Sequence, residues 1–587
     1  MCIGMLSWIG SHRIGRAAIE FLGHMRADPR LAKTVADHVF PGPVGIGSLL
    51  DPQAKALSAF AGFGCGFLVI GPVADETLEP SDWIIDLPNG SVVHCGRTPT
   101  ISYAEAADRL SQLGCDHVSV FAQLATVSDE IVASLVPHVA GFIVQAKDAQ
   151  HFHSLRLGFD GPLLIEATTA DIEYSGVEIA SGIYLSGESS QELHRAVTRA
   201  RRSLGEKVIL CGGSLSPQES HSLLKAGADL VFVDAGLAIS GPGLVKRTNE
   251  ALLSLLPAPD VEPLSLDAAR QSWFWGLMLG VAVFVGGILA TILASSRVIL
   301  PYDETLCGIP RGAFEGINPR LLPFMAHDRM TLAGSMLSIG ILYGAIAWNG
   351  IRYGLHWAKI AIILSSGVGF FSFFLFLGYG YFDPFHGFVT SVVVQFVFFI
   401  MLTPLGKAHP PADSEWTETP EWCRGQWGQL LFIGMGIGLT VAGLVISYVG
   451  CTLVFVETDF EFLQITAAEA LVGTDRLIPL IAHDRASLGG MLLSNGIIIW
   501  LAAQWGIRAG TRWLWCAFAW AGNIAFSAAI GVHVAVGYQS WEHVAPAAAG
   551  WLVWIIALCL TKGWMCRVSS SEGMIRVIPP SGVGVEW

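Results

Sequence analysis

The pattern of apolar and polar positions divides the chain into two halves of different character. Between about residues 31 and 256, short apolar runs alternate with amphipathic stretches, which is the order expected of strands alternating with helices. The strand-like runs are 66–71, 117–122, 140–146, 162–167, 182–187, 207–213 and 228–236. This pattern predicts a (β/α)8 barrel of the TIM type, for which about 225 residues is a suitable length.

The second half consists of apolar runs long enough to cross a bilayer, which takes about 20 residues of helix. We expect eight spans, at 272–296, 330–351, 360–382, 387–406, 425–456, 486–507, 513–541 and 544–561. No run before residue 272 is long and uncharged enough. The sequence therefore predicts a barrel in residues 1–260, an all-α transmembrane domain of eight helices after it, and a tail over 563–587.

A shift of 156 residues reveals an internal similarity in the second half. It aligns 317–352 with 473–508 and gives 17 identical residues in 36. The tetrapeptide Ala-His-Asp-Arg occurs at the same place in both copies, at 326–329 and 482–485. Two unrelated apolar helices would not share so many positions, so we interpret the similarity as an internal duplication.

The similarity continues to the end of each copy. With one residue inserted, GYFDPFH at 380–386 aligns with GYQSWEH at 537–543. Each copy then contains four spans, an even number, and both copies have the same orientation in the membrane. The sequence predicts two parallel four-helix repeats, over 270–406 and 425–562, related by an axis along the membrane normal.

Several polar residues occur in both copies and are predicted to lie at the outer membrane interface. They are Asp303, His327, Asp328, Arg329 and His386 in the first repeat, and Asp459, His483, Asp484, Arg485 and His543 in the second. Within each copy we expect these groups to lie together, with His327 near Asp303 and His386, and His483 near Asp459 and His543. One interpretation is structural, with Asp328 and Asp484 as helix N-caps and the arginines in ion pairs. A second is a site for a ligand or a quinone head group. A third, a metal site, lacks the usual ligand spacing, and we predict no metal.

The histidines also bear on haem. His533 is the one histidine that we predict to lie within the middle of a span. A haem held by two histidines needs partners at matched depth, and the predicted spans do not provide them. Haem is therefore not among the cofactors that we predict.

Composition and charge narrow the class of protein. A mean hydropathy of +0.54 with only 14% charged residues indicates a membrane protein. The net charge of −14 leaves no basic stripe, which argues against nucleic acid as a partner. The short loops at 352–359 and 508–512 carry Lys and Arg, and the start of the chain does not resemble a signal peptide. We predict a multi-pass protein of a bacterial inner membrane with a cytoplasmic N-terminal domain.

One segment resembles a known family. CGGSLSPQESHSLLKAGADLVFVDAGLAISGPGLVKRTNEAL at 211–252 is similar to the C-terminal part of class 2, quinone-linked dihydroorotate dehydrogenases. DPRL at 28–31, FPGPVGIGSLLD at 40–51 and GFGCGFLVIGPV at 62–73 resemble the N-terminal part of that family. The resemblance covers 28–252 and leaves the membrane half unrecognised. It implies an FMN-binding barrel whose cofactor phosphate is held by Gly212, Gly213, Gly236 and Leu237.

The chain departs from this family where the chemistry takes place. The flavin-contacting lysine of the family is replaced by Glu166, and the segment that supplies the catalytic base corresponds to FAQLAT at 121–126, which has no serine at the position of the base. Pro52 and Pro72 replace a lysine and a threonine of the family, and its Thr-Asn-Thr-Thr turn falls near residues 186–187. A glutamate beside the ring would oppose the negative charge of a reduced flavin.

Two functions from different classes remain open at this stage. The first is a divergent dihydroorotate-dehydrogenase-like membrane protein, an FMN-binding oxidoreductase coupled to quinone whose usual catalytic residues are lost. The second is a barrel without catalysis that binds a phosphate-bearing ligand and acts as a sensor or scaffold for a transporter-like or receptor-like membrane domain. In both cases the expected partners are the lipid bilayer and either a quinone or another small molecule.

Overall fold

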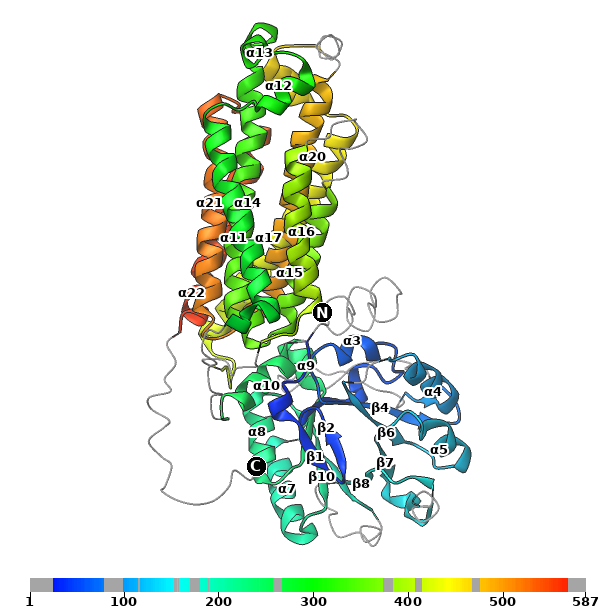
Figure 1. Ribbon diagram of the computed structural model, residues 1–587. Coiled ribbons are helices and arrows are strands. Elements are labelled where there is room, and N and C mark those ends of the chain that lie inside the picture. Colours follow the sequence, from blue (N-terminus) through cyan, green and yellow to red (C-terminus); the bar gives the residue numbers. More distant parts are fainter. Residues whose placement is uncertain are drawn as a thin grey trace. The chain divides into compact units, whose positions relative to one another are not determined.

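The protein folds into two compact units (Figure 1). The first comprises Met1–Ala258, Asp413–Glu418 and Ser570–Trp587, and the second comprises Pro259–Ala412 and Thr419–Ser569. The computed structural model describes residues 25–78, 99–114, 117–151, 156, 158–168, 180–187, 189–241, 243–256, 266–372, 384–406, 414–466 and 476–567.

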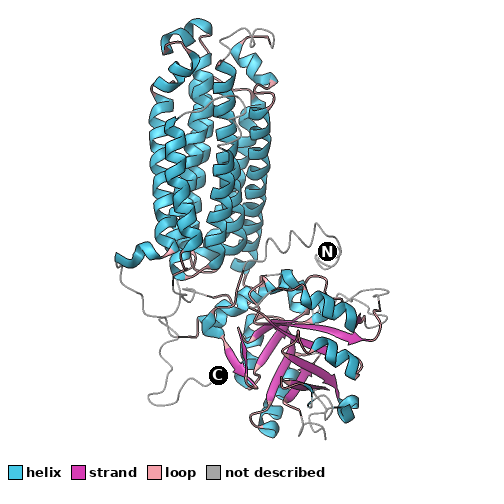
Figure 2. Ribbon diagram, turned by 45° about the vertical axis from the view of Figure 1, so that its right-hand side comes forward, coloured by secondary structure: helices cyan, strands magenta, loops and turns pink. Residues whose placement is uncertain are grey.

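The first unit is an eight-stranded parallel barrel, as the apolar pattern predicts (Figure 2). Its strands are β3 (Val44–Ile46), β4 (Phe67–Ala74), β6 (Ser119–Leu124), β7 (Gly141–Gln145), β8 (Leu163–Thr168), β9 (Gly182–Ser186), β10 (Val208–Ser214) and β11 (Leu230–Val233). The barrel closes where β3 pairs with both β11 and β4. β3 is the strand that the seven apolar runs did not include, because it has only three residues and two prolines precede it.

Aromatic side chains fill the interior of the barrel. An antiparallel hairpin of β1 (Lys33–Val35) and β2 (His38–Phe40) contributes Phe40, which stacks on Phe121 with ring centroids 5.4 Å apart. Tyr184 and Phe232 stack at 5.6 Å in the same interior cluster. Inward positions recur every second residue along a strand, so the residues two positions beyond these rings face the carboxyl-end mouth of the barrel.

The helices around the barrel begin at serine N-caps. The hydroxyls of Ser102, Ser128, Ser189 and Ser216 each accept a hydrogen bond from a backbone N–H in the first turn. They start α4 (Tyr103–Ser111), α5 (Asp129–Leu135), α7 (Ser190–Leu204) and α8 (Pro217–Ala226). Two more helices, α9 (Ala235–Ser240) and α10 (Leu244–Leu253), follow β11, and a short α3 (Leu57–Ala61) precedes β4.

A segment remote in sequence completes the barrel unit. Residues 414–418 come about 160 positions after the last barrel helix, and they pack on α8 and α10. Glu418 lies 3.6 Å from the Arg247 guanidinium and accepts a hydrogen bond from Ser240. The carbonyl of Trp416 accepts from the backbone N–H of Gln218 at 3.3 Å. We call residues 414–418 the docked segment.

The second unit consists of helices. The long ones are α11 (Ser272–Ser295), α14 (Leu321–Asn349), α15 (His356–Phe371), α16 (Pro384–Leu402), α17 (Pro420–Cys451), α20 (Leu477–Gly506), α21 (Arg512–Val536) and α22 (Trp541–Met565). Within the described residues, six of these are long and apolar enough to cross a membrane. The apolar helices at His356–Phe371 and Gly387–Leu402 are shorter than that, where the sequence predicted two further spans. Residues 373–383, which separate them, lie outside the described part.

The helical elements occur in the same order twice. Short helices α12 (Pro301–Cys307) and α13 (Arg311–Ile317) follow α11, and α18 (Glu457–Leu463) follows α17. α14 and α20 are the most buried of the six long apolar helices, with 56% and 72% of their apolar windows inside the protein, against 22% to 28% for the other four. α14 and α20 therefore lie at the packing centre of the helical unit.

Glycines allow the close approach of these central helices to their neighbours. A Cβ atom on Gly340 of α14 would lie 2.7 Å from the backbone nitrogen of Phe284 in α11. The corresponding Gly496 of α20 would meet the carbonyl oxygen of Gly436 in α17 at 2.7 Å. Close helix packing through small residues is the main way in which helices associate within lipid.

Candidate functional site

The two Ala-His-Asp-Arg segments lie inside helices rather than ahead of them. α14 begins at Leu321 and α20 at Leu477, so each aspartate of the tetrapeptide lies seven residues into its helix. The residues at the N-cap positions are Arg320 and Arg476. The interpretation of Asp328 and Asp484 as N-caps is therefore wrong, because proline and leucine residues start each helix two turns earlier than the polar segment.

Asp303 and Asp459 take the same place in the two sets of helices. Asp303 accepts from the backbone N–H of Leu300 at 2.9 Å, and Asp459 from that of Val456 at 2.7 Å, at the starts of α12 and α18. Both side chains are fully buried. A buried carboxylate needs a cation as well as hydrogen bonds, and each of them has an arginine.

The arginines of the tetrapeptides join the two sets crosswise. Arg329 contacts Asp303 of its own set at 2.9 Å and Asp484 of the other at 2.8 Å. Arg485 repeats this with Asp459 at 2.6 Å and Asp328 at 3.3 Å. The structure thus brings the two tetrapeptides together in one network, which we call the crossed ion pairs.

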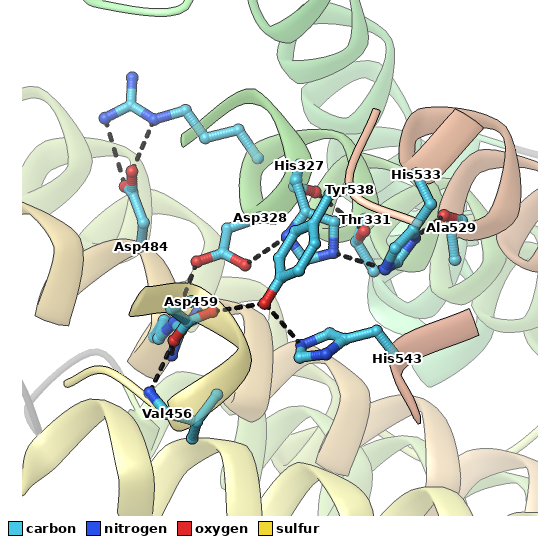
Figure 3. A network of polar contacts seen from close by, with 12 residues as sticks. His327, Asp328, Thr331, Val456, Asp459, Asp484, Ala529, His533, Tyr538 and His543 are labelled. Carbon is cyan, nitrogen blue, oxygen red and sulfur yellow. Dashed lines mark hydrogen bonds and ion pairs between the residues drawn. The ribbon is translucent and has the colours of Figure 1, made fainter. Parts of the chain in front are cut away.

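Three histidines lie beside the crossed ion pairs (Figure 3). The Nε2 atoms of His327 and His533 are 3.0 Å apart, and Nδ1 of His533 lies 2.6 Å from the carbonyl oxygen of Ala529. His543 packs near them, with its ring centroid 6.2 Å from that of His327. Tyr538 donates its hydroxyl to Asp459 at 2.7 Å and lies against the His543 ring.

Hydrogen bonds use both ring nitrogens of His533. The Ala529 carbonyl only accepts, so Nδ1 of His533 carries hydrogen and, in a neutral ring, its Nε2 accepts from Nε2 of His327. Nδ1 of His327 faces the Asp328 carboxylate at 3.0 Å, without the geometry of a hydrogen bond.

Our expected pairing within each repeat differs from the observed pairing. We expected His543 beside His483 of its own repeat, and the structure instead places it beside His327 of the first set. His483 contacts Asp484 through Nδ1 at 3.0 Å. The side chain of His386 lies outside the described part of the chain, so its expected approach to His327 stays a prediction.

Sequence analysis gave no role to His533 and Tyr538. His533 was assigned to the middle of a span, whereas it lies three residues before the end of α21, at the depth of the tetrapeptides. The repeat alignment contained a signal that could have found it. With the offset of 157 residues that pairs GYFDPFH with GYQSWEH, His533 corresponds to Phe376. A polar residue that is present in only one copy marks a difference between the copies.

A cavity of about 600 Å³ extends from this cluster into the helical unit. Five helices, α14, α17, α20, α21 and α22, contribute to its wall. One end is polar and the remainder is largely apolar. The polar end is lined by His327, Asp328, Arg485, His533 and His543. Among the described residues, no group of three or more His, Cys, Asp or Glu has the arrangement of a metal site.

The carboxyl-end mouth of the barrel forms a second candidate site. Three polar residues face the mouth, because each comes two positions after an interior side chain of its strand. They are Gln123 on β6, Glu166 on β8 and Asp234 at the end of β11. Gln123 donates to Glu166 at 3.2 Å, and Asp234 accepts from the backbone N–H of Leu49 at 3.2 Å. Burial raises the pKa of Asp234 to about 7, and burial together with Asp234 raises the pKa of Tyr184.

The four residues expected to hold a phosphate differ in their surroundings. A Cβ on Gly212 would lie 2.9 Å from the Tyr184 hydroxyl, and one on Gly236 would lie 2.7 Å from the Ser214 carbonyl, so packing alone requires both glycines. Leu237 is a buried core side chain. Gly213 has a φ of +85° and open space around its Cβ position. Only the Gly213 turn therefore remains accessible to a ligand.

Comparison with known proteins supports the class of the barrel. The chain is 24% identical over 298 residues to a quinone-type dihydroorotate dehydrogenase of Halobacterium salinarum, covering 39% of this chain and 83% of the relative. It is 26% identical over 332 residues to the quinone-type dihydroorotate dehydrogenase of Acidithiobacillus ferrooxidans, and this match covers 42% of this chain and 91% of the relative. No family model matches the chain. The N-terminal two-fifths is thus related, at low identity, to quinone-dependent dihydroorotate dehydrogenases, and the predicted resemblance is confirmed.

Solved structures of the same type of enzyme also match. The ligand-free dihydroorotate dehydrogenase of Eimeria tenella covers 42% of this chain and 94% of its own, with 15% identity and a TM-score of 0.34. A second structure of this enzyme, in complex with ferulenol, covers 42% and 91% with 14% identity and the same TM-score.

Proposed function

We propose that this is a divergent dihydroorotate-dehydrogenase-like membrane protein whose barrel binds a phosphorylated ligand without oxidising dihydroorotate. Its partner in the membrane is a quinone. The barrel faces the cytoplasm of a bacterial cell, and the helical unit arose by duplication of a four-helix repeat. The crossed ion pairs support the duplication, because Arg329 and Arg485 make equivalent contacts at equivalent positions.

The observation that carries the proposal is the pair of carboxylates at the mouth of the barrel. Glu166 and Asp234 both face this mouth, and the resemblance places Glu166 at the position of the family's flavin-contacting lysine. The residues at the ring position do not fit a flavin that gains negative charge on reduction. The Gly213 turn, in contrast, can present backbone N–H groups to a phosphate whatever the side chains around it.

The purified full-length protein tests this proposal. We expect no turnover of dihydroorotate with a soluble quinone, since losing a positioned general base costs about 10²- to 10⁴-fold. FMN and other phosphorylated compounds, added in a thermal-shift screen, should raise the unfolding temperature of the barrel, and Gly213→Val should abolish that shift. Dihydroorotate-dependent quinone reduction at a rate typical of enzymes would contradict the proposal, as would a barrel that no phosphorylated compound stabilises.

A second candidate, a ligand sensor, is favoured by one feature of the helical unit. The cavity at the histidine cluster is formed by residues of this unit, so the unit has a ligand site of its own. A barrel that binds a phosphorylated ligand without catalysis then belongs to the same chain as a membrane unit that binds a second molecule, and ligand binding is the role of both.

A further inference from the structure

We infer that the cavity in the helical unit binds an uncharged lipophilic molecule whose head group carries carbonyl or hydroxyl oxygens, of the isoprenoid quinone or quinol class. The inference deepens the proposed quinone partner by giving it a site. It rests on α14, α17, α20, α21 and α22 and not on the barrel, so a barrel that fails to bind a phosphorylated ligand would leave it standing.

The cavity exists because small residues face it. Gly438 and Ala442 of α17 lie across from Ala525 and Ala529 of α21, and Gly550 of α22 lines it as well. A Cβ atom on Gly438 would have no neighbour within 4 Å. At about 600 Å³ the space lies in the middle of the range of small-molecule sites, which is about 300 to 1,000 Å³.

The polar end of the cavity is suited to a neutral head group. Arg485 and Asp328 both line it, but they are paired with each other, so their charges offset. The ring nitrogens of His327 and His533 already contact each other and their neighbours, whereas Nε2 of His543 has only a long contact of 3.4 Å to the Tyr538 hydroxyl. With its Nδ1 beside the Thr458 hydroxyl at 3.1 Å, His543 can donate from Nε2 to a ligand in the cavity. Oxygen atoms on a ring can accept from such groups, whereas a charged head would have to displace an existing ion pair.

Deeper in the cavity a second polar pair interrupts the apolar wall. Asn495 and Ser338 contact each other at 3.2 Å, on α20 and α14. The amide of Asn495 has two N–H groups, and one of them suffices for Ser338. A molecule with oxygens at both ends of a ring could therefore be held between the histidines and Asn495, in the way that binding pockets combine apolar walls with a few directed polar groups.

The wall also shows how the molecule would enter. Val445 of α17 lines the cavity and is 55% exposed on the apolar surface of the helical unit. A solute that is dissolved in lipid can reach the cavity beside this residue. The first repeat has Phe376 where the second has His533, so we expect one such site per chain.

Cavity-filling variants test the inference in full-length protein reconstituted in lipid nanodiscs. The probe is a decyl-tailed benzoquinone, followed by equilibrium dialysis, with its quinol as a second probe. We expect saturable binding with one site per chain. Gly438→Leu should weaken it at least tenfold by filling the cavity. Gly434→Leu is the matched control, because Gly434 is one turn earlier on α17, also has open space at its Cβ position, and does not line the cavity.

A head-group variant tests the role of the histidines. His543→Phe removes the Nε2 donor at the polar end of the cavity, and we expect it to weaken binding of the quinone about tenfold without changing the binding of decane, which has no head group. Absence of saturable binding by either probe would overturn the inference. So would equal effects of Gly438→Leu and Gly434→Leu, an unchanged affinity in His543→Phe, or a cavity occupied by a phospholipid that neither probe displaces.

Discussion

At the residue scale, the crossed ion pairs make each tetrapeptide arginine indispensable. Arg485 is 6% exposed and is the cation for both Asp459 and Asp328. Arg485→Ala would leave two buried carboxylates without that partner, and removing one member of a buried pair typically costs about 3 to 5 kcal/mol. We expect a loss of this size in the free energy of unfolding, measured by denaturing detergent titration of the reconstituted protein.

An exposed ion pair on the same unit provides the control for this variant. Arg424 contacts Glu421 at 2.8 Å on the surface at the start of α17, and exposed pairs contribute about 0 to 1 kcal/mol. Arg424→Ala should therefore change the unfolding free energy little. Comparable losses in the two variants would show that the crossed ion pairs do not stabilise the helical unit.

The raised pKa of Asp234 predicts a dependence of barrel stability on pH. The carboxyl has a pKa of about 7 in the folded protein and 3.8 as its ordinary value, so between these limits the folded state holds the proton more tightly. The stabilisation is complete below pH 3.8 and is lost as the pH rises through 7. Asp234→Asn should flatten this part of the curve of barrel unfolding temperature against pH, measured by circular dichroism.

The control for the pH effect is an exposed aspartate at the same end of the barrel. Asp75 follows β4 and is exposed, so Asp75→Asn should leave the slope between pH 4 and 7 as it is in the unchanged protein. A slope that persists in Asp234→Asn would assign the pH dependence to other groups.

Single residues also show how far the site could be predicted from the sequence. The internal similarity drew attention to His327, Arg329 and their counterparts, because a polar or charged residue that occurs in both copies of an apolar segment needs a partner. Repetition could not show that the partners of each arginine come from both copies, since that depends on how the helices pack. It also drew attention away from His533, a polar residue that occurs in one copy alone and faces the cavity.

At the element scale, the approach of α11 to α14 sets a sharp limit on side-chain size. Gly340→Ala would bring a Cβ to 2.7 Å from the Phe284 backbone, which cannot move independently of its helix. Overpacking of this kind costs about 1 to 3 kcal/mol, and we expect a corresponding loss in detergent-titration stability. Gly344→Ala, one turn further along α14, meets only Leu277 at 3.8 Å and should be neutral or slightly stabilising. The opposite order would contradict the packing described.

The elements themselves were predicted to different degrees. Runs of apolar residues found seven barrel strands because each strand is buried on both sides. The three-residue β3 has too few positions to form a pattern, and barrel closure defines it instead. Eight long apolar helices were expected and eight are present, of which six meet the length of a span within the described residues. The other two, α15 and α16, adjoin residues 373–383, which lie outside the described part.

At the scale of the whole molecule, similarity to known proteins identifies the barrel, whereas the pattern of apolar residues and the internal similarity identify the helical unit. The barrel is related to quinone-dependent dihydroorotate dehydrogenases at 24% to 26% identity, a level at which a fold persists while side chains at a mouth can change completely. The resemblance seen in the sequence did not extend to the helical unit, where the internal similarity guided the prediction and the contacts of Arg329 and Arg485 show how the two sets of helices meet.

The docked segment is synthesised long after the strands and helices of the barrel. Residues 414–418 are synthesised 161 positions after Leu253, the end of the last barrel helix, which is roughly 8 to 32 seconds at typical rates of translation. The nascent barrel must therefore wait for Glu418 while the first set of helices is produced. Stalled chains that end at residue 406 should lose their barrel to limited proteolysis faster than chains that end at residue 451, and Glu418→Ala together with Trp416→Ala should remove that difference.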